Sequence, residues 1–102
     1  MNRRDAIVAT IEALHAEIAA LKANDLAALA AATRAKLAGI EAAAAHEGTP
    51  ASPEIRELAA EAHRLNETCR IYVNLMAANV RRRLQALTGA AGAPYRPGLA
   101  FA

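Results

Sequence analysis

Cysteine and aromatic residues are scarce in this chain of 102 residues, which contains no tryptophan, two tyrosines and one phenylalanine. Cys69 is the single cysteine, so an internal disulfide is excluded and a cytoplasmic location is expected. The shortage of aromatic residues also argues against a β-sandwich or β-barrel, whose strands are usually rich in aromatic and β-branched side chains.

Long apolar runs are also missing. No stretch reaches the roughly 18 uncharged apolar residues that a transmembrane helix requires. The segment after Arg4 carries Glu12 and Glu17, unlike the apolar region of a signal peptide. The excess of basic over acidic residues, 12 against 10, gives a formal net charge of +2, which is weak support for nucleic-acid binding.

Alanine is the most abundant residue and occupies 30 of the 102 positions. It is the best helix former, but its methyl group buries little surface. The length is suited to one domain at most. The composition therefore predicts an all-α protein with a thin core.

The apolar residues between positions 3 and 47 recur with helical spacing. Ile7, Ile18, Leu29 and Ile40 are each eleven residues apart, a period that favours one continuous and nearly straight helix over residues 3–47. The spacing shifts once, where a gap of five residues surrounds an Asn-Asp pair at positions 24 and 25. Both residue types also cap helices, so a break there is the alternative.

A linker is predicted over residues 48–52. Gly48 ends the first helical pattern, and the prolines that follow cannot continue a helix. Ser52, Pro53 and Glu54 then form a helix start: a capping hydroxyl, a proline suited to the first turn and an acid at the positive end of the helix dipole.

The second helix is predicted from residue 53 to about residue 88, with Gly89 as its C-cap. Residues 90–102 contain small residues and prolines and are expected to form an irregular, flexible tail. Two long helices joined by a short linker pack antiparallel. Residues 1–89 are therefore predicted to form an antiparallel helical hairpin or a small helix bundle.

The second predicted helix carries more apolar surface than a two-helix interface covers. Its main stripe passes through Cys69, and Ile71, Tyr72 and Leu75 widen it on one side. Every residue from Ile71 to Met76 except one asparagine is large and apolar. Either a broken or folded-back first helix covers this face, or a helix of another chain binds to it.

Nothing in the sequence indicates catalysis. His15, His46 and His63 lie on separate helical turns without a second ligand nearby, and no nucleophile motif or phosphate-binding glycine loop is present. We therefore expect no enzymatic activity, no metal and no cofactor. The three arginines at 81–83 are interpreted as a solvated helix end or as a contact for an acidic protein, since no aromatic residues accompany them for nucleic-acid stacking.

Three short motifs, in this order, resemble the FlgN-type flagellar export chaperones. The first is Asn24-Asp25-Leu26, which follows Glu17 and precedes Lys36-Leu37. The second is Leu65-Asn66-Glu67-Thr68-Cys69, similar to a Leu-Asn-x-x-Asn element but with cysteine in place of the second asparagine. The third is Tyr95-Arg96-Pro97-Gly98, which is similar to a Tyr-x-x-x-Gly tail signature and one residue shorter.

The resemblance implies a cytoplasmic chaperone without catalysis. Such a chaperone binds helix-forming terminal segments of hook-associated (hook–filament junction) proteins, prevents premature assembly and delivers them to the membrane export gate. No nucleic acid and no small-molecule substrate would be involved, and Tyr95 would contact the export gate. The expected partner-binding residues lie on the second helix: Leu65, Asn66, Cys69, Ile71, Tyr72, Val73, Leu75, Met76 and Val80. The alternative is a structural helical hairpin that self-associates through the same stripes and has no client.

Overall fold

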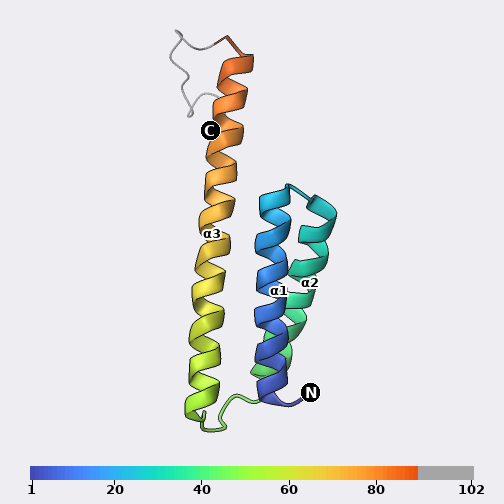
Figure 1. The fold of residues 1–102 in the computed structure, drawn as a ribbon, viewed down its shortest axis with the longest axis vertical. Coiled ribbons are helices and arrows are strands. Elements are labelled where there is room, and N and C mark those ends of the chain that lie inside the picture. Colours follow the sequence, from blue (N-terminus) through green and yellow to red (C-terminus); the bar gives the residue numbers. More distant parts are fainter. Residues whose placement is uncertain (90–102) are drawn as a thin grey trace. The chain divides into compact units, whose positions relative to one another are not determined.

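The structure is a computed structural model that describes residues 1–89, and it is all-α as predicted (Figure 1). Helix α1 spans Arg3–Ala23, α2 spans Leu26–Ala44 and α3 spans Pro53–Leu87. The predicted tail over residues 90–102 lies outside the described residues.

The chain divides into two compact units, Met1–Tyr72 and Val73–Ala102, with the boundary inside α3. The first unit contains α1, α2 and the part of α3 that ends at Tyr72. In the second unit, the structure describes the remainder of α3 and the two residues that follow it.

The prediction of one continuous helix over residues 3–47 is wrong, because the helix is interrupted at Asn24 and Asp25, between α1 and α2. Asn24 ends α1 in the left-handed conformation (φ 55°, ψ 41°), which asparagine tolerates better than most residues. The N–H of Asp25 then donates to the carbonyl of Ala20 (2.9 Å), and its side chain accepts from the N–H of Ala28 (3.0 Å) as the N-cap of α2. The two capping residues therefore prevail over the eleven-residue period.

Small residues close the contact between α1 and α2. Ala6, Ala13 and Ala20 recur every seven residues on α1 and are buried, and α2 contributes the buried Ala32 and Gly39, again seven apart. Side chains of this size let two helix backbones approach closely. This contact, the small-residue seam, joins α1 and α2 into an antiparallel hairpin (Figure 1).

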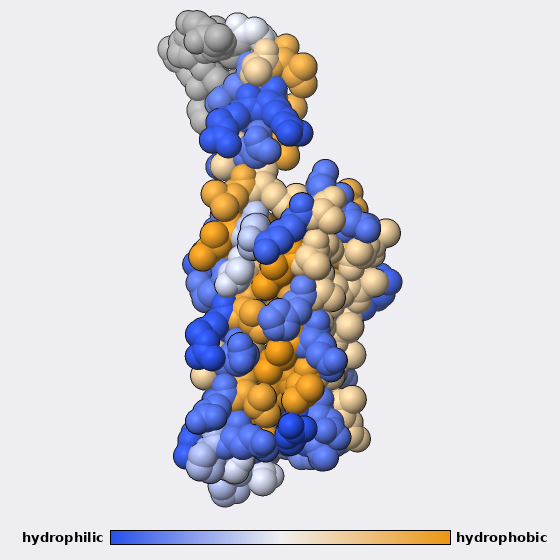
Figure 2. Space-filling model, viewed as in Figure 1, coloured by the Kyte–Doolittle hydropathy of each residue, from blue (hydrophilic) through white to orange (hydrophobic). Residues whose placement is uncertain are grey.

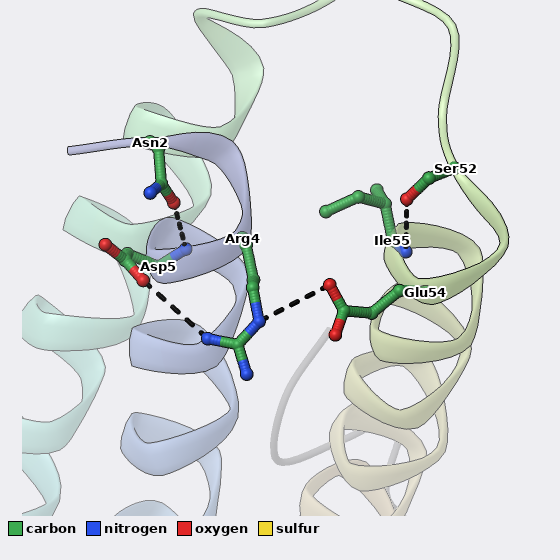
Figure 3. A network of polar contacts seen from close by, with 6 residues as sticks. All are labelled: Asn2, Arg4, Asp5, Ser52, Glu54 and Ile55. Atoms are coloured by element: carbon green, nitrogen blue, oxygen red, sulfur yellow. Dashed lines mark hydrogen bonds and ion pairs between the residues drawn. The ribbon is translucent and has the colours of Figure 1, made fainter.

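The start of α3 follows the predicted signal. Ser52 Oγ accepts a hydrogen bond from the N–H of Ile55 (3.2 Å), which caps the helix (Figure 3). The preceding helix is shorter than predicted, because α2 ends at Ala44 and a turn leads to Gly48, whose positive φ of 91° suits a glycine.

Within the first unit, α3 runs parallel to α1. At the beginning of both helices, Arg4 Nε lies 3.4 Å from Glu54 Oε1 (Figure 3). Eighteen residues later on each helix, Lys22 Nζ lies 5.7 Å from the centroid of the Tyr72 ring. Both contacts are partly or fully exposed and stabilise the arrangement by about 1 kcal/mol or less each.

Within the first unit, the backbone of α3 stands apart from the hairpin of α1 and α2. Up to Tyr72, no Cα atom of α3 lies within 8 Å of a Cα atom of α1 or α2. Only side chains therefore bridge the gap between α3 and the hairpin, and they leave room for a groove that is described below.

Candidate functional site

All nine predicted partner-binding residues lie on α3, five in the first unit and four in the second. The five are Leu65, Asn66, Cys69, Ile71 and Tyr72, and the four are Val73, Leu75, Met76 and Val80. Tyr95, the predicted contact with the export gate, lies outside the described residues.

Cys69 belongs to the interior of the first unit rather than to its surface. It is the one buried residue of α3 within the described chain, and its Sγ lies 3.8 Å from the carbonyl oxygen of Leu14 on α1. A partner would reach this thiol only if α3 moved away from α1. The side chain therefore acts as a small apolar contact between the two helices.

The other predicted residues of the first unit differ in accessibility. Leu65 and Tyr72 are half-buried, and Tyr72 has the ammonium group of Lys22 over its ring. Asn66 and Ile71 are exposed. Ile71 is therefore the large apolar residue of this group that is most available to a partner.

The second unit exposes a row of apolar side chains. Val73 is 50% exposed, and Val80, Leu84 and Leu87 are at least as exposed. Their spacing of seven, four and three residues places them on one face of α3, the exposed α3 strip. Figure 2 shows hydrophobic side chains beside hydrophilic ones on this part of the helix.

The prediction from sequence omitted Leu84 and Leu87 from the site and included two residues that are not exposed members of the strip. Leu75 is 61% exposed but lies off the face that the strip occupies, and Met76 is half-buried. The signal for the two leucines was available, since both continue the same helical period. Only the three-dimensional arrangement shows that both are exposed.

The C-terminal part of α3 is basic as well as apolar. Arg81, Arg82 and Arg83 are exposed, and no acidic residue follows Glu67 in the sequence. The exposed α3 strip thus has positive charge beside it, which favours a partner with acidic residues at the margin of its apolar face.

A buried polar cluster connects α1 and α2. Glu17 is 4% exposed, and its Oε2 accepts from Thr33 Oγ1 (2.7 Å) and lies 3.1 Å from Lys36 Nζ. Its Oε1 has no hydrogen-bond partner among residues 1–89. Burial raises the pKa of the Cys69 thiol to about 11, and the negative charge of Glu17 adds to this increase. The thiol is therefore a poor nucleophile at neutral pH.

The burial of Cys69 predicts slow alkylation of its thiol and a pH-dependent stability. At pH 8, Cys69 should react with iodoacetamide at least about 100-fold more slowly in the native protein than in urea, because a pKa of about 11 instead of 9.0 lowers the thiolate fraction by that factor. The unfolded thiol also ionises first as pH rises from 9.0 to about 11, so the unfolding free energy should fall over this range, by up to about 1.4 kcal/mol per pH unit. Cys69→Ala should lack this component. Equal alkylation rates in both states would contradict the buried placement.

A groove of about 680 Å³ lies between the three helices of the first unit. The sequence analysis did not predict this groove, because it favoured one continuous helix over residues 3–47, and a groove between three helices requires that helix to be interrupted. The separation of α3 from α1 and α2 within the first unit depends on tertiary packing, which no local sequence pattern predicts. The apolar walls of the groove include Ile7, Leu14, Leu37, Ile40, Ile55 and Ala59.

Neither a metal centre nor a membrane span is found in the described part of the chain. No group of three His, Cys, Asp or Glu side chains within residues 1–89 could hold a metal ion. No described helix combines the length and the apolar character needed to cross a bilayer.

Comparison with protein-family models, with curated proteins and with solved structures found no match for this chain.

Proposed function

We propose that this protein is a cytoplasmic chaperone of flagellar type III export. It binds helix-forming terminal segments of hook-associated proteins, keeps them from assembling prematurely and delivers them to the export gate. The observation that carries this proposal is the exposed α3 strip, because a chain without a partner rarely leaves such a row of large apolar side chains in water.

The energetics of the strip suit the capture of a flexible segment. A segment that folds when it binds must offset the entropy of becoming ordered. Val73, Val80 and Leu84 are each about half exposed, so covering them contributes roughly 1 kcal/mol per side chain. Contacts of this size support reversible binding, which is what a chaperone that releases its client needs.

Two motifs of the resemblance to FlgN-type chaperones fall at defined places in the fold. Asn24-Asp25 coincides with the break between α1 and α2, and the Leu65–Cys69 element lies on the part of α3 that faces α1. These positions support the proposal, since motifs with structural roles are expected at breaks and contacts between helices.

Substitutions on α3 test the proposal. Val73→Asp should weaken the binding of terminal peptides from hook-associated proteins at least tenfold, because the new carboxylate would be buried without a partner. Tyr72→Ala should weaken it less, through loss of apolar contact. Fluorescence anisotropy with labelled peptides measures both, and Leu26→Asp is the control, since Leu26 is also an exposed apolar residue and lies on α2.

Unchanged affinity in both α3 variants would overturn the assignment of the binding surface. If the wild-type chain binds no such peptide and light scattering shows a dimer that Val73→Asp dissociates, the chain is instead a self-associating structural hairpin. Addition of a client peptide to the wild-type chain distinguishes the chaperone from the self-associating hairpin. A client that binds the exposed α3 strip should lower the mass of any dimer in light scattering, because client and second copy compete for the same strip.

A further inference from the structure

The groove of the first unit has the length of a short helix. It extends along α1 from Arg3 to Leu14 and along α3 from Ile55 to Asn66. Each stretch advances eleven residues, or about 16 Å at the helical rise, which corresponds to about three turns. An extended apolar groove of this length, walled by three helices, matches the apolar face of one further helix.

The groove is open to solvent along α2. Leu37 is 57% exposed and Ile40 is 48% exposed, although both line it. An occupant therefore covers these two side chains while it keeps its own outer surface in water. An amphipathic helix has both kinds of face, whereas a wholly apolar small molecule has one.

One end of the groove is positively charged. Arg3 and Arg56 line this end, and each donates through Nη1 to a carbonyl of the linker, at Thr49 and Ala51 respectively (both 2.8 Å). Neither guanidinium forms a salt bridge with a carboxylate of residues 1–89. Glu47, the one acidic residue among those that line the groove, lies two residues before Thr49 and so at this same end, where the two arginines still outnumber it.

We propose that this groove binds about three turns of an amphipathic helix from another protein, with an acidic C-terminal end against Arg3 and Arg56. The C-terminal end of a helix carries the negative end of its dipole, so its charge complements the two guanidiniums. A second copy of this chain is a poorer occupant, because α3 carries Arg81, Arg82 and Arg83 near its C-terminal end. The groove shares no residue with the exposed α3 strip, so the inference adds a second binding site to the one on which the proposed function depends.

Two synthetic peptides of about 12 residues test the inference with the full chain. Both carry the same leucine face; one ends in two glutamates with a free carboxylate, and the other ends in two lysines with an amide. The acidic peptide should bind at least tenfold more tightly by isothermal titration calorimetry. Arg3→Gln combined with Arg56→Gln should remove most of this preference, and Arg34→Gln, on α2 outside the groove lining, should keep it.

The apolar part of the groove is tested separately. Leu37→Asp should weaken binding of the acidic peptide at least tenfold, and Leu26→Asp on the same helix should not, because Leu26 is outside the groove lining. Both side chains are more than half exposed, and circular dichroism will verify that each variant is folded. Ile40→Gln provides a second groove variant if Leu37→Asp proves unfolded.

Three results would overturn the inference: equal affinity for the two peptides, no effect of either groove variant, or a dimer in light scattering that Leu37→Asp dissociates. The synthetic helices contain no flagellar sequence. Binding of these helices without binding of hook-associated peptides therefore refutes only the flagellar function, and the opposite result refutes only the groove.

Discussion

Replacement of Lys36 by methionine is expected to lower the free energy of unfolding by about 3–5 kcal/mol. The ammonium group lies 3.1 Å from Glu17 Oε2, and the two side chains are 18% and 6% exposed. Without Lys36, Glu17 keeps one hydrogen bond, from Thr33, while its other oxygen already lacks a partner. An ionised carboxylate in this environment is destabilising. Urea unfolding followed by circular dichroism at pH 7 measures the loss.

A double variant separates the loss of the ion pair from the loss of the lysine itself. Glu17→Leu combined with Lys36→Met should be close to the wild type in stability, because apolar side chains of similar volume often replace a buried ion pair at little cost. Lys22→Met, on the exposed surface of α1, should change stability by about 1 kcal/mol or less. A loss below about 1 kcal/mol in Lys36→Met would show that water reaches Glu17.

Substitution of Gly39 by alanine should destabilise the hairpin by about 1–3 kcal/mol, although alanine favours helices by about 1 kcal/mol over glycine. A Cβ atom at this position would contact Thr10 Oγ1, and it would lie 3.1 Å from the backbone nitrogen of Thr10 and 3.2 Å from the carbonyl oxygen of Ala6. Gly39→Leu should be worse, because the larger side chain forces α1 and α2 apart. Thermal unfolding measures both.

A second substitution tests the mechanism of this loss. Thr10→Ala removes the oxygen nearest to the new Cβ, so it should recover part of the stability in the Gly39→Ala background. Ala35→Leu is the matched control, because Ala35 lies exposed on α2 and its enlargement should change stability by no more than about 0.5 kcal/mol. An increase in stability for Gly39→Ala would mean that the seam is wider than described.

The fold was largely predictable from local signals. The alanine content and helical spacing predicted an all-α chain, and Ser52 and Pro53 located the start of α3, whose end at Leu87 is one residue from the prediction. The same reasoning failed at Asn24 and Asp25. There the periodicity and the capping preference conflicted, and only the gain from closing α1 on α2 decided between them.

The candidate site was less predictable, because burial depends on which helix covers which face. Cys69 and Val80 share one stripe in the sequence, yet the first is buried and the second is half exposed. The groove was missed for a related reason. Leu37 and Ile40 resemble core residues in the sequence, and nothing local reveals that α3 stands too far away to cover them.

The residues of the small-residue seam, which hold α1 and α2 together, are not among the residues that line the groove. Because alanine and glycine close the contact between α1 and α2, Leu37 and Ile40 on α2 remain about half exposed in the groove. Substitution of leucine, isoleucine or arginine around the groove should therefore change its surface while the hairpin stays intact. Substitution at the seam itself would be far less tolerated, so homologous chains should vary most around the groove and least where two backbones touch.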